Sequence, residues 1–251
     1  MTRFFYFSSI VLLAFFGLSV HKPLNFLEDQ LRFERVRNAS LEKELKLKTS
    51  LLTNGLTLSD LNVIFVAYKA SDLLEIYGKS KTETKYKKIM SYPICARSGV
   101  LGPKRKMGDY QVPEGFYHID RFNPTSSYYL SLGINYPNLS DKRKSTFSNL
   151  GGDIFIHGSC VTIGCLPMTD DAIKEIYLLA VHARNNGQTT IPVYVFPFEM
   201  SNQHWKTYQL MYSDQPALLN FWKNLKEGYD QFQSEKKVLK FSISTNGDYI
   251  F

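Results

Sequence analysis

The residues best suited to chemistry lie within one stretch, residues 154–168. His157 is followed by a glycine, and eight residues later Gly164-Cys165 stands just before a helix start signal at residues 169–171. A thiol is only about a few per cent ionised at neutral pH, so a nucleophilic cysteine needs a base and a positive electrostatic environment. An imidazole and a helix N-terminus can supply both. We therefore interpret Cys165 as a candidate nucleophile and His157 as its base.

The glycine before the cysteine suits the same chemistry. Because Gly164 has no β-carbon, the backbone can turn sharply there, and we expect the amides of Gly164 and Cys165 to face a developing oxyanion. The alternative is that Cys165 is a buried small hydrophobic residue, as many lone cysteines are. Residue spacing alone leaves both interpretations open.

Four segments resemble the L,D-transpeptidase (YkuD-type) family, and in particular its YafK-like branch. The first is His157-Gly158 followed by Thr162-Ile163-Gly164-Cys165, and the others are Gly102-Pro103-Lys104-Arg105, residues 111–117 and residues 123–128. The likeness covers roughly residues 60–200.

The resemblance implies an envelope enzyme that acts on peptidoglycan stem peptides. In that family pattern Cys165 attacks the carbonyl of a diaminopimelate and forms a thioester, while His157 removes and later returns the proton. The carbonyl of Gly158 would orient the imidazole. No cofactor and no metal ion are implied.

Two departures from the wider family concern the fate of the acyl group. Ile163 replaces a second histidine, and Leu166 and Pro167 stand where many members have an arginine or asparagine. In the family those polar groups line the substrate and acceptor sites. We expect transfer to an amine first. Hydrolysis of the same linkage, for example to release a wall-linked envelope protein, is the alternative.

Three further residues are expected at the substrate site. Thr162 belongs to the cysteine motif, and His118 follows a Pro-Glu-Gly turn whose counterpart borders the cleft in the resembling enzymes. Tyr136 lies in a segment that resembles the family's substrate-cleft strand. We interpret His118 as a strand residue lining or flanking the cleft rather than as a second base.

Two other classes of function stay open. His157, Cys160 and Cys165 could ligate zinc, although the spacing lacks a Cys-x2-Cys knuckle and a fourth ligand would have to come from another histidine. The candidates for that fourth ligand are His118, His182 and His204. A non-catalytic wall-binding protein would also retain these residues.

Composition favours one sizeable globular core, because 44% of the 251 residues are hydrophobic and 14% are aromatic. The formal net charge is +7. Lysines are scattered in short runs rather than interleaved with aromatics, so we expect a solvated surface and no nucleic-acid partner.

Residues 1–20 read as an export signal, with Arg3 before a long uncharged apolar run. The segment is either a secretory peptide or an uncleaved membrane anchor, and no cysteine follows it for a lipoprotein anchor. We expect a location in the periplasm or cell envelope.

Three cysteines are too few for a disulfide scaffold. Cys95 lies in an apolar run and is expected to be a strand-buried thiol. Cys160 is either a buried filler, which we prefer, or a partner that could switch Cys165 off by oxidation.

We predict a β-rich α+β fold, a twisted and mostly antiparallel sheet with the Cys165 elbow leading into a helix. A helical arm at residues 21–58 precedes a catalytic domain at residues 59–251, which ends in a C-terminal extension. The arm has loosely helical apolar spacing at Leu27, Leu31, Val36, Leu41, Leu45 and Leu52. Strands are expected at residues 63–68, 73–77, 86–96, 116–119, 128–137, 191–197 and 237–243, loops at 98–112 and 140–152, and helices at 170–185 and 215–229. Because prolines bracket the strand at 191–197, it should lie near a sheet edge or end abruptly.

Overall fold

The structure is a computed structural model that describes residue 1 and residues 25–251. Apart from Met1, the expected export segment at residues 1–20 lies outside the described residues. Within residues 25–251, no helix combines the length and apolar character that crossing a membrane would require.

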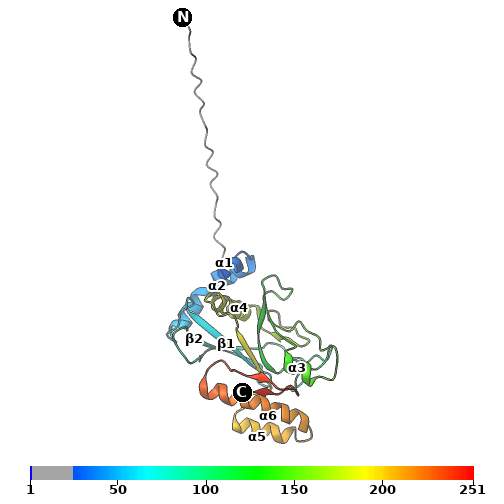
Figure 1. Ribbon diagram of the computed structural model, residues 1–251. Helices are drawn as coiled ribbons and strands as arrows, with labels where there is room; N and C mark the ends of the chain where they lie inside the picture. Colours follow the sequence, from blue (N-terminus) through cyan, green and yellow to red (C-terminus); the bar gives the residue numbers. More distant parts are fainter. Residues whose placement is uncertain (2–24) are drawn as a thin grey trace.

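An eight-stranded sheet forms the centre of the molecule, in the order β3-β2-β1-β8-β4-β5-β6-β7 (Figure 1). Its strands are β1 Leu61–Tyr68, β2 Leu73–Ser80, β3 Lys87–Pro93, β4 Gly115–Asn123, β5 Ser131–Ile134, β6 Phe155–His157, β7 Leu166–Pro167 and β8 Pro192–Phe196. A separate two-stranded sheet pairs β9 Ser242–Ile243 with β10 Tyr249–Ile250.

The first three strands form the predicted antiparallel meander. The expectation that residues 191–197 lie near an edge was wrong, because β8 is an interior strand, parallel to β1 and antiparallel to β4. Its prolines are tolerated there because Pro192 is the first residue of the strand and Pro197 follows its end. At those positions the missing N–H interrupts no central ladder bond.

The central strands are buried on both faces. In β1, Val63 and Phe65 belong to the core cluster that packs under α2 and α4, whereas Ile64 and Val66 belong to the cluster that packs against α6. This alternation follows from the two-residue period of a strand. The apolar run is therefore continuous rather than alternating with polar residues.

Helices cover both faces of the sheet (Figure 1), with α2 and α4 on one side and α5 and α6 on the other. The helices are α1 Phe26–Gln30, α2 Glu34–Leu52, α3 Leu139–Lys144, α4 Asp170–Asn185, α5 Asn202–Met211 and α6 Pro216–Glu235. The prediction for residues 170–185 is confirmed. The short helix α3 interrupts a predicted loop, and α5 was not foreseen because none of its residues is buried.

The helical arm packs with a different face from the one that leucine spacing suggested. Its buried stripe in α2 consists of Val36, Ala39, Leu47 and Leu51. Leu41 and Leu45 are 85% and 78% exposed, and Leu52 is exposed as well. A stripe repeating every three to four residues selects one face, and these three leucines fall outside it.

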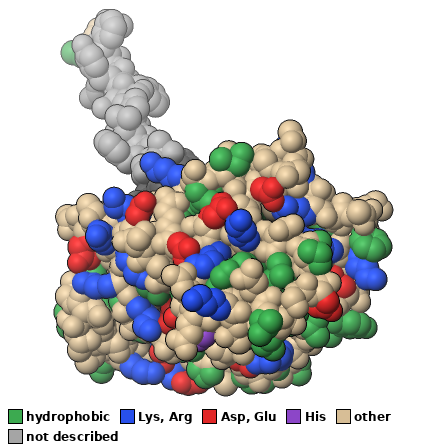
Figure 2. Space-filling model, turned by 90° about the horizontal axis from the view of Figure 1, so that it is seen from below, with side chains coloured by type: hydrophobic (Ala, Val, Ile, Leu, Met, Phe, Trp, Pro, Cys, Tyr) green, Lys and Arg blue, Asp and Glu red, His purple; other side chains and the backbone are tan. Residues whose placement is uncertain are grey.

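Charged side chains of both signs are distributed over the surface. Figure 2 views the molecule from the side of α5 and α6, and lysines and arginines there are interspersed with acidic side chains rather than gathered into one patch. This pattern is typical of a solvated face.

A buried ion pair joins the end of β1 to the start of β4. Lys69 and Glu114 lie 2.9 Å apart, and Glu114 is fully buried. The ammonium of Lys69 also donates to the carbonyls of Gly102 and Val112, which fills all three of its donor positions. Glu114 accepts from the Gly102 amide and from the Trp222 indole of α6. The pair therefore fixes both ends of the loop at residues 102–112.

We predict that Lys69→Met destabilises the protein by about 3–5 kcal/mol, because it leaves the Glu114 carboxylate buried without its cation. Lys87→Met is the matched control, since Lys87 and Glu83 form an ion pair in which both side chains are 39% exposed. The control should cost no more than about 1 kcal/mol. Urea unfolding measures both, and a similar small loss in the two variants would contradict this role for Lys69.

Candidate functional site

Cys165 lies immediately before β7, at the edge of the sheet. Leu166 and Ile156 form a buried cross-strand pair between β7 and β6, in parallel orientation. His157, the last residue of β6, pairs with Pro167, so Cys165 directly precedes the strand that is paired with the one carrying the histidine. Cys165 precedes α4, which begins at the predicted start signal with Thr169 as its N-cap, and the short strand β7 lies between the thiol and the helix.

His157 is held by its backbone neighbour and by an aromatic ring. Its Nδ1 lies 2.5 Å from the carbonyl oxygen of Gly158, and its ring centre lies 4.6 Å from that of Tyr128. The side chain is 2% exposed. Burial lowers the pKa of His157, and the bond to Gly158 opposes that shift. Hydrogen bonding of Nδ1 to a carbonyl places the proton on Nδ1 and leaves Nε2 as the basic nitrogen.

A close fit explains why residue 158 is a glycine. A β-carbon there would lie 2.6 Å from the Asp170 carboxylate and 2.9 Å from the Tyr128 carbonyl. The same carboxylate accepts a hydrogen bond from the amide of Ser159, which has a positive φ of 63°. The first turn of α4 therefore positions the histidine loop rather than the cysteine.

The thiol of Cys165 is partly buried and donates to the carbonyl of Asp153 at 3.7 Å. Burial raises the pKa of Cys165. A hydrogen bond with the Phe155 backbone and the charge of Lys104 oppose the shift, whereas the charge of Asp153 adds to it. Among the described residues, no hydrogen bond joins Cys165 to His157. The resting pair is thus a neutral thiol and a neutral imidazole.

Thr162 closes the turn that carries the cysteine. Its hydroxyl oxygen accepts from the amides of Gly164 and Cys165, and the hydroxyl donates to the carbonyl of Cys165. The expectation that these two amides are free for an oxyanion was therefore wrong. Gly164 has a φ of +135°, and a β-carbon there would lie 3.0 Å from the Gln111 carbonyl. Its need for glycine is conformational.

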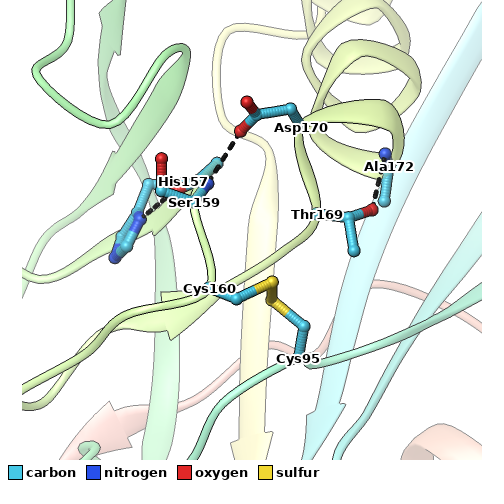
Figure 3. The surroundings of a disulfide bond; sticks show 8 residues. Cys95, His157, Ser159, Cys160, Thr169, Asp170 and Ala172 are labelled. Carbon is cyan, nitrogen blue, oxygen red and sulfur yellow. Dashed lines mark hydrogen bonds between the residues drawn. A yellow bond between two sulfur atoms is a disulfide. The ribbon is translucent and has the colours of Figure 1, made fainter.

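A disulfide joins Cys95 to Cys160 (Figure 3), with their Cα atoms 5.4 Å apart. Both sequence expectations for these residues were wrong, since Cys95 is not a free thiol and Cys160 is neither a buried filler nor an oxidation partner of Cys165. The bond ties the segment after β3 to the loop that follows His157. Cys165 is the one free cysteine.

The disulfide also removes the zinc alternative built on His157, Cys160 and Cys165. A metal-binding cysteine must be a thiolate, and the sulfur of Cys160 is already bonded. Within residues 25–251, no group of three or more potential ligands comes together to hold a metal ion.

A cavity of about 180 Å³ opens beside Cys165. Its walls are largely apolar and include Ile94, Val112 and Leu166, with Ser98 and Arg97 also on the lining. The buried hydroxyl of Ser98 has no hydrogen-bond partner among the described residues. Such a mainly apolar hollow with a few polar groups is typical of a small-ligand site.

The other expected substrate residues lie away from this cavity. His118 is on β4 and lines a different hollow, of about 320 Å³, with Asn135 and Phe241. Tyr136 is 6% exposed, and its hydroxyl donates to the carbonyls of Lys104 and Leu150. Neither residue lines the cavity beside Cys165, and their contact with substrate stays a prediction.

Sequence reasoning missed Asp153 and Phe155, whose backbones contact the thiol. Their side-chain types carried no signal for this role, because the contacts are made by main-chain atoms. Asp153 has a positive φ of 55° and follows Gly151-Gly152. That glycine pair was the one sequence feature that marked an unusual turn near the site.

Comparison with known proteins agrees with this arrangement. Residues 62–195 match the family model of the L,D-transpeptidase catalytic domain, YkuD. The chain belongs to this family. It is 37% identical over 185 residues to "Putative L,D-transpeptidase YafK" of Escherichia coli strain K12, covering 73% of this chain and 71% of that protein. The protein of the same name from E. coli O157:H7 gives the same values.

Among solved structures, this chain is similar to the helical cell shape determining protein Pgp2 from Campylobacter jejuni. The two share 20% sequence identity, and the match has a TM-score of 0.44 over 74% of each chain. Bd1075 from Bdellovibrio bacteriovorus shares 23% identity at a TM-score of 0.39, over 70% of this chain and 64% of that one.

The raised pKa of Cys165 predicts slow alkylation at neutral pH. Because burial disfavours the thiolate, the rate of reaction with iodoacetamide should keep rising above the pKa of a free thiol, about 8.5. Peptide mass spectrometry under non-reducing conditions should find the label on Cys165, with Cys95 and Cys160 in one linked peptide pair. A rate that levels off near pH 7 would show instead a stable thiolate and would contradict the neutral pair.

Proposed function

We propose that this chain is a cell-envelope cysteine enzyme that acts on peptidoglycan stem peptides at diaminopimelate, with Cys165 as nucleophile and His157 as base. One observation carries the proposal: the single free cysteine borders a cavity and directly precedes β7, which pairs with the strand ending in a histidine whose tautomer is set by the Gly158 carbonyl. Membership of the L,D-transpeptidase family supports the substrate class.

The chemistry follows from two neutral groups. As the sulfur of Cys165 attacks the peptide carbonyl, its proton passes to Nε2 of His157, which then protonates the leaving amine. The products of this half-reaction are a thioester on Cys165 and a free amine. In the second half, His157 takes a proton from the incoming amine or water and returns it to the sulfur. The enzyme ends in its starting state.

The burial of Cys165 and His157 is consistent with a proton that moves from the thiol to the imidazole during the attack. A low pKa keeps His157 unprotonated at neutral pH, so it can accept a proton, and Gly158 holds the ring while it does so. Stabilisation of the imidazolium comes from the same carbonyl, which accepts the Nδ1 proton. Activity should therefore fall as the pH drops through the lowered pKa of His157, below its ordinary value of about 6.5.

The disulfide supports an exported location. Bonds of this kind form and persist outside the reducing cytosol, in the periplasm or at the cell surface. The Cys95–Cys160 bond would form while the protein folds in such an oxidising compartment, and Cys165 would remain a free thiol.

Transfer to an amine is our first choice for the second half-reaction, and hydrolysis is the second. The observation that favours hydrolysis is the character of the residues around the thiol. Leu166 and Pro167 are buried, and Ile163 is an apolar side chain that is 75% exposed. None of these side chains can hydrogen-bond an incoming amine, which would have to be held in line with the thioester. A wall-linked envelope protein is a candidate substrate for hydrolysis.

We predict that His157→Ala lowers turnover by about 10²–10⁴-fold, the usual contribution of a positioned acid and base. His204→Ala is the matched control, because His204 lies on α5, where no residue is buried, and should leave turnover unchanged. Release of the leaving amine from a tetrapeptide muropeptide measures both variants. Near-normal turnover in His157→Ala would make this histidine structural.

A second experiment separates the two fates of the acyl group. The enzyme receives a tetrapeptide muropeptide, or a peptide-linked protein remnant, with excess amine acceptor, and product masses are recorded. Cross-linked or amine-exchanged products establish transfer. Products one water heavier, in amounts independent of the acceptor, establish hydrolysis and overturn our first choice.

A further inference from the structure

A row of residues crosses three neighbouring strands and ends at Phe155, whose backbone contacts the free thiol. Arg121 of β4 pairs with Gly133 of β5, and Gly133 pairs with Phe155 of β6. The thiol of Cys165, which precedes β7, forms a hydrogen bond with the backbone of Phe155. Residues that face each other across strands project their side chains from the same side of the sheet. Arg121 therefore starts on the sheet face that carries the ring of Phe155.

Gly133, which has no side chain, leaves space for the side chain of Arg121. A β-carbon at this position would lie 3.0 Å from Nε of Arg121 and 2.6 Å from the Asp120 carboxylate. Because no side chain stands there, Arg121 lies across β5, and its guanidinium carbon is 4.9 Å from the ring centre of Phe155. The arginine thus reaches toward β6 instead of into open solvent.

The guanidinium of Arg121 contacts Asp153, the residue whose carbonyl accepts from the thiol of Cys165. Nη1 of Arg121 lies 2.8 Å from the carboxylate of Asp153, and the carbonyl of Asp153 accepts from the thiol of Cys165. Asp153 therefore lies between the guanidinium of Arg121 and the thiol of Cys165. Arg121 and the thiol contact the same residue, one through its side chain and the other through its carbonyl.

The ion pair with Asp153 contributes little to holding the fold together. The side chains of Arg121 and Asp153 are 47% and 79% exposed, and exposed pairs are worth at most about 1 kcal/mol. Exposure also leaves the guanidinium accessible to a second anion. Its planar fork matches a carboxylate through two parallel hydrogen bonds.

We infer that Arg121 is a specificity-determining residue that binds a carboxylate of the acyl donor beside the carbonyl attacked by Cys165, taking it in exchange for Asp153. The inference rests on the proposed function, in which that donor residue is diaminopimelate. This amino acid keeps a free carboxylate on its side chain when its other carboxyl group is in the peptide. The matching anion is thus present one side chain away from the reacting carbonyl.

The test compares two tetrapeptide donors that differ only in this carboxylate, which is free in one and a carboxamide in the other. Affinity is measured by calorimetry in the Cys165→Ala background, and KM and kcat are measured with Cys165 present. Arg121→Gln should weaken binding and raise KM for the carboxylate donor by about 10- to 100-fold, the worth of a paired charged hydrogen bond. Its affinity for the carboxamide donor and its kcat should change little.

Three further variants distinguish carboxylate binding from a purely structural effect. Gly133→Ala keeps the arginine but displaces it, and should reduce the preference for the carboxylate donor. Arg32→Gln removes the same charge from an ion pair with Asp29 before α2, at 3.7 Å, and should leave both donors unaffected. Asp153→Asn removes one of the two carboxylates that pair with Arg121, the other being that of Asp120, and should tighten binding of the carboxylate donor.

The outcomes separate this inference from the proposed function. Equal losses for both donors in Arg121→Gln, or no loss for either, overturn the role of Arg121 even when the wild-type enzyme turns both donors over. A carboxylate preference in binding that Arg121→Gln abolishes, without turnover by the wild-type protein, upholds Arg121 and overturns the reaction. Failure of both donors to bind the Cys165→Ala protein overturns both.

Discussion

The contact between Lys69 and Glu114 fixes the loop on which the site depends. Both charges are removed from water, so the pair is tolerable only because every donor of the ammonium and both carboxylate oxygens are used. Those bonds hold Gly102 and Val112, and Val112 forms part of the cavity wall beside Cys165. The indole of Trp222 links α6 to the same carboxylate. The C-terminal helix is thereby coupled to the wall of the site.

The opposite side of the site is held by covalent and backbone constraints. The Cys95–Cys160 disulfide and the bond from the Ser159 amide to Asp170 fix the loop after His157 (Figure 3). Pairing of β6 with β7 joins the strand that carries the histidine to the strand that follows the cysteine. Because burial raises the pKa of the thiol and lowers that of the imidazole, both groups are uncharged at neutral pH. In the proposed mechanism, the nucleophile is generated only when a carbonyl is present to receive it.

Much of this could be predicted from local patterns. The β-branched run of β1, the capped apolar period of α4 and the motif around His157 and Cys165 each contain their own signal. The arrangement of β8 inside the sheet could not be predicted, since its position depends on long-range pairing that proline placement does not report. The disulfide was missed because residues 95 and 160 are far apart in sequence. The row from Arg121 to Phe155 depends on strand register, which single-sequence periodicity does not specify.

The central claim is that the acyl group passes through a thioester on Cys165. Intact-mass spectrometry of enzyme quenched in acid during turnover of a tetrapeptide muropeptide tests it most directly. The account predicts an adduct equal to the donor mass less the leaving amine, located on the peptide that contains Cys165 and absent from Cys165→Ala. Turnover that proceeds in Cys165→Ala, or an adduct on any other residue, would contradict it.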